Sequence, residues 1–231
     1  MNIRAFLGRG REFLGRTRGS ESARNPSGTF SLLAMRLERD LPRQNRGRSV
    51  FVVTADDDAA GVEATMELAW CLAEELGHTV LMVDGSFEAL ALSAALGMAD
   101  KAGLAELISA PGADHAKLEG TVQPTAHPRV SILPHGSDTG ERVTRLESIR
   151  GMLTAACEQF DFVLVLGTIL VEGSRSLAFS SLVDAALLVA VEEQTTVDLV
   201  TRGKRILNDC GAARVALVLA NRPQARRSNG R

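Results

Sequence analysis

Residues 49–69 of the chain read SVFVVTADDDAAGVEATMELA, and this stretch decides the fold. It begins with a run of apolar and β-branched residues at 50–54, which is typical of a strand covered on both faces of a sheet. Asp56, Asp57 and Asp58 follow, and apolar residues then recur at helical spacing from about Ala60. The stretch therefore predicts a buried strand, a tight turn and an amphipathic helix in succession.

This succession is the layout of a phosphate-binding loop, but the residues for that chemistry are missing. Such a loop uses glycines to bring backbone N–H groups together, a Lys for the β/γ-phosphates and a Ser or Thr for Mg²⁺. Here Gly61 stands where the last glycine is expected, Val62 replaces the Lys and Glu63 replaces the hydroxyl. A carboxylate about 4 Å from a phosphate oxygen costs roughly 4 kcal/mol at an effective dielectric near 20. That cost exceeds the ~0.3–1 kcal/mol that a helix N-terminus offers an anion.

The three consecutive aspartates have two readings. In the first, they form a solvated turn, and one of them caps the helix that follows. In the second, they recruit Mg²⁺ in an unusual loop. The first reading needs no ligand, and the second would allow weak nucleotide chemistry.

The rest of the chain alternates between strand and helix patterns. Helices are expected at 29–41, 88–96, 104–109, 145–159 and 195–208, with a Pro- and Gly-bearing loop from 110 to about 129. Strands are expected at 79–84, 130–133, 162–166, 185–191 and 214–220. This alternation predicts an α/β fold with a mostly parallel sheet and helices on both faces, a three-layer sandwich.

Composition indicates one soluble globular domain with extensions, since the chain has 231 residues and 45% hydrophobic content. We expect a basic, flexible N-terminal arm and linker at 1–27, the α/β domain at 28–222 and a basic flexible tail at 223–231. Cys71, Cys157 and Cys210 are far apart, so neither a disulfide framework nor a metal site is predicted. There is no apolar run of about 18 residues and no signal-peptide core, so a cytoplasmic location is expected.

The first 48 residues differ in charge from the rest of the chain. They contain eleven arginines and four acidic residues, a net charge of +7 that leaves −9 for the remainder of a chain whose total is −2. The sequence FLGR occurs at 6–9 and again at 13–16, a spacing that would place both Phe-Leu pairs near one side of a helix. A disordered tail, a membrane- or partner-docking arm and nucleic-acid binding are the alternatives, and the last lacks interleaved aromatics. The candidate arm residues are Arg4, Phe6, Leu7, Arg9, Arg11, Phe13, Leu14 and Arg16.

The order of these motifs resembles the cytoplasmic domain of bacterial tyrosine autokinases (BY-kinases), within the wider family of MinD- and ParA-like P-loop ATPases. The resemblance rests on FVVTA at 51–55, GHTVLMVD at 77–84, ILPHG at 132–136, FDFVLVLGT at 160–168, LVDAALLVAV at 182–191 and ALVLANR at 216–222. It implies a P-loop NTPase-like fold. It also implies a membrane partner, because the autokinases work with the copolymerases that set the chain length and export of capsular and exopolysaccharides.

The resemblance fails at the positions that carry the family's activity. The loop Lys corresponds to Val62, the second acidic residue after the 79–84 strand to Ser86, and the Asp that ends the 162–166 strand to Leu166. The family's Glu/Arg/Arg oligomerisation helix corresponds to Gly28, Ser31 and Ala34, so the autokinase-type ring is not expected. The C-terminal tyrosine cluster has no counterpart, because the chain contains no tyrosine. The residues retained for a vestigial nucleotide site are Gly61, Thr65, Asp84 and Asn221.

We therefore expect no catalytic residue, no metal, no cofactor and no kinase or ATPase activity, since phosphoryl transfer depends on positioning by Lys and Mg²⁺. The expected role is a scaffold or regulator of polysaccharide synthesis and export at the inner face of the membrane, in contact with a membrane copolymerase or export protein. One alternative is a MinD- or ParA-like switch in cell polarity, motility or partitioning that binds ATP–Mg²⁺ weakly. Another is a polarity or motility regulator that kept the fold and changed partners.

Overall fold

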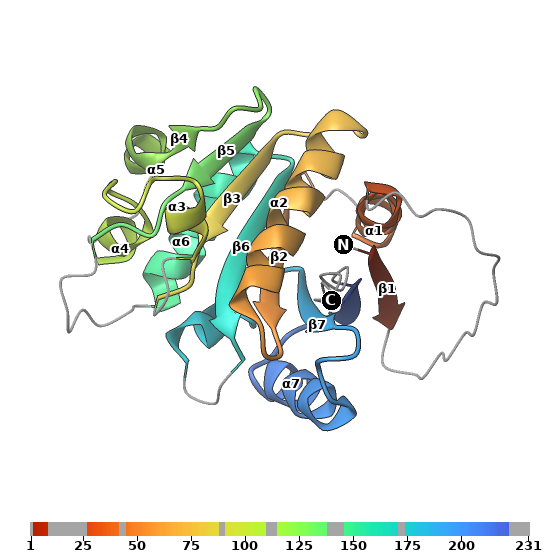
Figure 1. The fold of residues 1–231 in the computed structure, drawn as a ribbon. Helices are drawn as coiled ribbons and strands as arrows, with labels where there is room; N and C mark the ends of the chain where they lie inside the picture. The colour runs from red at the N-terminus through yellow and green to blue at the C-terminus, as the bar shows by residue number, and fades with distance from the viewer. Residues whose placement is uncertain are drawn as a thin grey trace, which may run out of the picture.

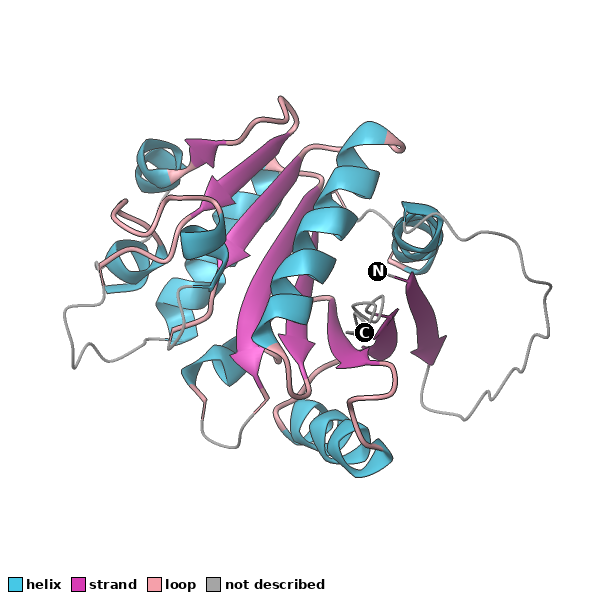
Figure 2. Ribbon diagram, in the orientation of Figure 1, coloured by secondary structure: helices cyan, strands magenta, loops and turns pink. Residues whose placement is uncertain are grey.

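A computed structural model of the chain describes residues 2–8, 27–41, 45–87, 91–109, 115–137, 146–170 and 174–221 (Figure 1). The side chains of 2–8, 27–29, 115–117 and Asn221 are outside this description. Figure 2 shows a single twisted sheet with helices packed against it. No helix among the described residues combines the length and apolar character needed to cross a bilayer.

The described strands form one eight-stranded sheet in the order β1-β8-β7-β2-β6-β3-β5-β4. Every neighbouring pair from β8 to β5 is parallel, whereas β1 and β4 add antiparallel edges. The bounds are β1 (Asn2–Gly8), β2 (Arg48–Thr54), β3 (Val80–Asp84), β4 (Gln123–Pro124), β5 (Val130–Leu133), β6 (Phe162–Ile169), β7 (Ala185–Val191) and β8 (Val215–Asn221).

Helices cover both faces of the sheet, as the alternation of patterns predicts. The first three helices pack on one face and the others on the opposite face. The bounds are α1 (Ser27–Asp40), α2 (Asp58–Glu74), α3 (Ala91–Ala95), α4 (Leu104–Ser109), α5 (His115–Thr121), α6 (Leu146–Gln159), the 3₁₀ helix η1 (Arg175–Phe179) and α7 (Val197–Asp209).

Strand β2 lies in the middle of the sheet and contributes to both apolar layers. Val50 and Val52 belong to the layer under α1 and α2, whereas Phe51 and Val53 belong to the layer under α6. All four side chains are buried, and burying one such side chain contributes about 1.5–3 kcal/mol. The apolar run at 50–54 therefore forms a strand because both of its faces are covered.

The predicted α/β fold with a mostly parallel sheet is confirmed, and four local expectations need correction. Residues 2–8 of the expected flexible arm form β1, which pairs with β8 over the whole of its length. An extended strand also replaces the helical arrangement considered for the first Phe-Leu pair, because the free edge of β8 offers backbone partners. The loop expected from 110 to about 129 contains α5 and β4. Strand β6 continues past the expected end at 166 to Ile169.

Candidate functional site

The segments expected to carry nucleotide chemistry meet at the carboxyl edge of the parallel strands. These are the turn at 55–57 between β2 and α2, and the residues that follow β3, β6 and β7. Open α/β sheets bind their ligands at this edge, where the strand order reverses.

The three consecutive aspartates, two in the turn and one at the start of α2, all accept hydrogen bonds from protein groups. Asp57 is the N-cap of α2 and accepts from the backbone N–H of Ala60 at 3.2 Å. Asp56 accepts from the Thr195 hydroxyl, in the segment after β7, at 2.7 Å. Asp58 accepts from the backbone N–H of Ile169, the last residue of β6, at 2.9 Å. The turn is thus fastened to two neighbouring strand ends, and the predicted Asp cap is confirmed.

Hydrocarbon fills the space around the retained glycine. Gly61 lies inside α2, and a Cβ added to it would come within 2.6 Å of the Thr54 Cγ2 and 3.2 Å of the Leu166 Cδ1. Leu166, which the sequence predicts to stand in place of a metal-binding Asp, is buried. Val62, at the position of the Lys, is half-buried and packs on the same apolar layer. Gly61 therefore allows close packing of α2 on β2 and β6, and the groups around it offer no charge to a phosphate.

Asp84 ends β3 and is fully buried. Its Oδ2 accepts from the backbone N–H and the hydroxyl of Ser93, at 2.7 and 2.6 Å. Its Oδ1 accepts from the backbone N–H of Ser86 at 3.2 Å and from the Ser86 hydroxyl. Donors from the chain thus reach both oxygens, and the carboxylate links the end of β3 to α3.

The other predicted site residues lie in α2, in β8, in β1 and in the segment after β1. Thr65 is fully buried in α2, and its hydroxyl donates to the carbonyl of Gly61 at 2.8 Å. Asn221 is the last residue of β8 and pairs with Asn2, but its side chain is outside the description. Arg4, Phe6 and Leu7 lie in β1 and their side chains are likewise not described. The remaining arm residues, Arg9, Arg11, Phe13, Leu14 and Arg16, lie outside the described residues.

Sequence reasoning missed Ser93, Thr195 and His135 at this edge. No sequence pattern marks Ser93 or Thr195, because each meets its aspartate only through the folded sheet. His135 follows β5 and is fully buried, with its ring 5.4 Å from that of Phe87 in an edge-on arrangement. Neither ring nitrogen of His135 has a hydrogen-bond partner among the described residues. Its backbone N–H donates to the Ser93 hydroxyl at 2.9 Å, which joins it to the Asp84 cluster.

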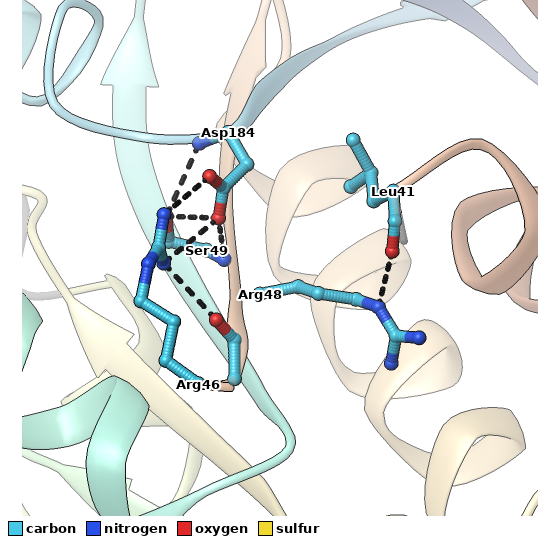
Figure 3. A network of polar contacts seen from close by, with 6 residues as sticks. Leu41, Arg46, Arg48, Ser49 and Asp184 are labelled. Atoms are coloured by element: carbon cyan, nitrogen blue, oxygen red, sulfur yellow. Dashed lines mark hydrogen bonds and ion pairs between the residues drawn. The ribbon is translucent and has the colours of Figure 1, made fainter. Parts of the chain in front are cut away.

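The opposite, amino edge carries a second polar network, shown in Figure 3. The Asp184 carboxylate accepts from the Arg46 guanidinium at 2.6 Å and from the backbone N–H and hydroxyl of Ser49 at 2.8 and 2.9 Å. Burial alone would raise the pKa of the Asp184 carboxyl, but the hydrogen bonds from Arg46 and Ser49 outweigh burial and lower it below 3.8. Arg48 points the other way in Figure 3 and donates to the Leu41 carbonyl.

The residues at the carboxyl edge do not fit an ATP–Mg²⁺ complex. The loop at this edge contains no Lys. An apolar side chain, Leu166, stands where a metal-binding carboxylate would be needed, and three aspartates would face the phosphates. In the described part of the chain, no three His, Cys, Asp or Glu side chains are grouped as a metal site requires. This chemistry weighs against the reading in which the aspartates recruit Mg²⁺, because each carboxylate already accepts a hydrogen bond from the chain.

The structure is similar to the kinase domain of the Escherichia coli tyrosine kinase ETK, with a TM-score of 0.74 and 17% identity, covering 94% of this chain and 86% of that one. It is also similar to the chimerical protein CapA2B2, with a TM-score of 0.71 and 17% identity over 87% and 86% of the two chains. The cell division ATPase MinD of Pyrococcus furiosus gives a TM-score of 0.57 and 24% identity, with 73% and 69% covered. No protein-family model and no curated protein sequence matches the chain. The resemblance to tyrosine autokinase domains and to MinD- and ParA-like ATPases is confirmed as one of structure, and the chain has the P-loop NTPase-like α/β fold.

Proposed function

We propose that this protein is a non-catalytic scaffold or regulator built on a P-loop fold. Its proposed process is the synthesis and export of a bacterial exopolysaccharide or capsule, in contact with a membrane chain-length or copolymerase protein. The proposal rests mainly on the contacts at the carboxyl edge of the sheet, where the chain's own groups contact the residues that would have to face a nucleotide. Asp56 accepts a hydrogen bond from the segment after β7, and Asp58 accepts one from the end of β6. Leu166 packs against Gly61.

Electrostatics support the absence of phosphoryl transfer. That reaction is catalysed mainly by cations that neutralise charge on the phosphates, and a preorganised Lys and Mg²⁺ supply them. The loop instead presents carboxylates, and Val62 and Leu166 occupy the cationic and metal-side positions. Opening the edge to a nucleotide would break the hydrogen bonds of the aspartates and expose buried hydrocarbon.

Calorimetric titration of ATP–Mg²⁺ into the full chain tests the non-catalytic part of the proposal. We expect no saturable heat, and a dissociation constant of about 10 μM or tighter, roughly −7 kcal/mol, would overturn it. Val62→Lys is the matched variant, because it places a Lys in the loop while Leu166 still stands in place of a metal-binding carboxylate. That variant is expected to release no phosphate from ATP. Steady release would contradict the prediction that Leu166 stands in place of the metal-binding Asp.

The polysaccharide role rests on the structural likeness to autokinase domains and needs a test in the cell. Deletion of the gene is expected to change the amount or chain length of the exported polymer. A complementing copy carrying Val62→Lys should restore the polymer, because the proposed role does not use the loop chemistry. If deletion leaves the polymer unchanged and alters cell polarity, motility or partitioning, the role as a switch or polarity regulator replaces this one.

Location at the membrane is part of the same proposal. Residues 2–8 belong to the sheet, so the membrane-contacting part of the arm is assigned to residues 9–18, which carry Arg9, Arg11, Arg16, Arg18 and one Phe-Leu pair. Basic residues gain about 1 kcal/mol each near an anionic leaflet, and salt screens this attraction. Recruitment by this segment and by the membrane partner together is expected, with vesicle binding that weakens as salt is raised.

A further inference from the structure

A cavity of about 460 Å³ lies beside the C-terminal half of α2, away from the aspartate turn that precedes this helix. We call it the α2 cavity. Two buried sheet residues, Met82 of β3 and Val130 of β5, form its floor, and Leu96, which follows α3, also lines it. Cavities of about 300–1,000 Å³ with a mostly apolar lining are typical of small-molecule sites. The α2 cavity therefore has the size and the floor of a ligand site.

The open side of the α2 cavity presents an aromatic ring. Trp70 lines the cavity and is 53% exposed, so much of its indole is open to a ligand. The His127 ring contacts the indole edge-on, with 4.9 Å between the ring centroids. His127 is itself fixed, because its Nδ1 accepts from the backbone N–H of Arg129 at 3.1 Å and its Nε2 bonds Glu74 at 2.9 Å. The indole is therefore positioned before a ligand arrives, which lowers the entropic cost of binding.

Three carboxylates line the same cavity, and no Lys or Arg of the described chain does. Glu74 bonds His127, whose Nδ1 is already an acceptor, so the ring hydrogen lies on Nε2 and leaves the Glu74 charge in place. Glu75 accepts from a neutral donor, the Ser31 hydroxyl of α1, at 2.6 Å. Glu67 has no hydrogen bond or ion pair in the described part of the chain. The described lining is thus negatively charged, and it contains no Lys or Arg to neutralise that charge.

The sign of this charge is opposite to what α2 itself requires. A helix C-terminus carries a partial negative charge, so basic residues in the last turn stabilise it and acidic residues do not. Helix α2 has no basic residue in its last turn, ends at Glu74 and has Glu75 as its C-cap. The guanidinium of Arg129 donates to the Gly77 carbonyl, past the end of the helix, and does not line the cavity. Because positions that break a local rule of stability are commonly functional, these carboxylates indicate a cationic ligand.

Two sulfur-containing side chains complete the uncharged part of the lining. Burial raises the pKa of the Cys71 thiol to about 11, so this group stays protonated and adds no charge at neutral pH. Met66 is 37% exposed, and methionine adapts to apolar groups of different shape. The cavity thus offers apolar surface to the body of a ligand and carboxylates to its charged end.

We propose that the α2 cavity binds a small organic cation, an ammonium or guanidinium compound with an apolar body. The apolar body lies on Met82 and Val130. Glu67, Trp70 and Glu74 follow one another at spacings of three and four, so they share one stripe of α2 with the indole between the two carboxylates. The cationic group lies at this stripe, because an indole face attracts cations and carboxylates form strong hydrogen bonds with charged N–H groups. The proposal is independent of the scaffold role, since the cavity lies away from the carboxyl edge.

Trp70 makes the proposal measurable, because it is the only tryptophan of a chain that has no tyrosine. Three probes share a phenylbutyl body and differ in charge: phenylbutylamine, which is protonated at neutral pH, phenylbutanol and phenylbutyrate. Each is titrated into the full-length protein while Trp70 emission is recorded. We expect a saturable change with the amine, at a Kd about tenfold lower than that of the alcohol, and none with the butyrate. Equal affinity for amine and alcohol would overturn the proposal, and so would the absence of a saturable change with the amine.

Glu67→Gln tests the charged end of the site. It is expected to weaken binding of the amine about threefold to tenfold and to leave binding of the alcohol unchanged, because only the amine uses the carboxylate. Glu147→Gln is the matched control, since it makes the same change in net charge at an exposed position of α6, on the opposite face of the sheet. If both variants weaken the amine equally, net charge and not the cavity attracts it, and the proposal fails.

Ala126→Phe tests the location. Ala126 lines the cavity and is exposed, so a ring at this position takes up ligand space without disturbing the core. Affinity for the amine is expected to fall about tenfold or more, because the apolar body loses its place in the cavity. Ala59→Phe, at an exposed position in the first turn of α2, should bind the amine as wild type does. Unchanged affinity in Ala126→Phe would place the amine elsewhere and overturn the proposal.

Discussion

Asp84 is a fully buried carboxylate, and two nearby serines supply donors to both of its oxygens. Ser93 is the more important of the two, because its hydroxyl also accepts from the backbone N–H of His135 at 2.9 Å. Ser93→Ala is expected to lower the free energy of unfolding by about 2–3 kcal/mol, since it removes a donor from a buried charge and leaves a buried N–H unpaired. Urea denaturation measures this loss.

Ser109→Ala is the control for that prediction. The Ser109 hydroxyl bonds only the Ala105 carbonyl of its own helix, at 2.6 Å, in the described contacts. Its loss should cost less than about 0.5 kcal/mol, because such local bonds add little to a helix. If the two variants are equally stable, Asp84 does not depend on Ser93, and its role as a structural carboxylate is wrong.

Thr54, the last residue of β2, gives a prediction of the opposite sign. Its hydroxyl is buried and has no hydrogen-bond partner among the described residues. Thr54→Val replaces this hydroxyl with a methyl group of similar size, so we expect a gain of about 1 kcal/mol in the free energy of unfolding. Thr79→Val is the comparison, because the Thr79 hydroxyl donates to Asp161 at 2.9 Å and accepts from its backbone N–H at 3.1 Å. That variant should lose stability, and a gain in both would refute the argument from hydrogen bonding.

Helix α2 packs closely on β2 and β6 at Gly61. Gly61→Ala is expected to cost about 1–3 kcal/mol, because the added Cβ would lie 2.6 Å from the Thr54 Cγ2. Gly120, in the exposed part of α5, has nothing within 4 Å of an added Cβ. Gly120→Ala should therefore raise stability by about 0.5–1 kcal/mol through helix propensity. Thermal unfolding of both variants tests these predictions. If Gly61→Ala leaves the stability unchanged, the contact between Gly61 and Thr54 has room for a Cβ.

The elements that the sequence predicts well are those with a strong local pattern. Strands β2, β3, β6 and β7 each contain an apolar run of four or more residues, and the burial of these runs on both faces follows from that composition. Helix α5 was missed because its sequence, HAKLEGT, has one large apolar residue and no periodicity to read. Strand β1 was missed because its arginine and its terminal glycine indicate a solvated arm, and its pairing depends on β8, more than two hundred residues away.

The same distinction applies to the candidate site. The cap by Asp57 is local, three residues from its partner, and the sequence predicts it. The partners of Asp56 and Asp58 lie 139 and 111 residues away, so only the assembled sheet shows that these carboxylates are engaged. That Val62 and Leu166 stand in place of the Lys and Asp of tyrosine autokinases remains a prediction from the sequence, whereas the packing of Leu166 against α2 appears only in the folded structure.

At the scale of the whole molecule, two similar acid–hydroxyl pairs hold neighbouring strands at the amino edge. The carboxylate of Asp184, before β7, accepts from the backbone N–H and hydroxyl of Ser49 in β2, and its own N–H donates back to that hydroxyl at 3.1 Å. Asp161, before β6, makes the same reciprocal set with Thr79, before β3. These pairs fix the starting register of four adjacent parallel strands, independently of the carboxyl edge.

The Asp184 pair predicts how stability depends on acid. Its folded-state pKa is lowered, so its contribution is complete above the ordinary carboxyl value of 3.8 and is lost as the pH falls below that value toward the folded pKa. Asp184→Asn is expected to lower the free energy of unfolding at neutral pH by roughly 1–3 kcal/mol, because the charge-assisted bonds to Arg46 are lost. The same variant should then lose less stability than wild type on acidification through this range.

Denaturant unfolding across the acid range tests this prediction. Ser49→Ala keeps the carboxylate and the Arg46 contact but removes one hydroxyl donor, so its acid dependence should fall between those of wild type and Asp184→Asn. The order of the three profiles matters more than any single value, because other carboxyl groups titrate in the same range. Parallel profiles for wild type and Asp184→Asn would mean that the Asp184 pair contributes nothing to acid sensitivity, and that other pairs set the register of β2 and β7.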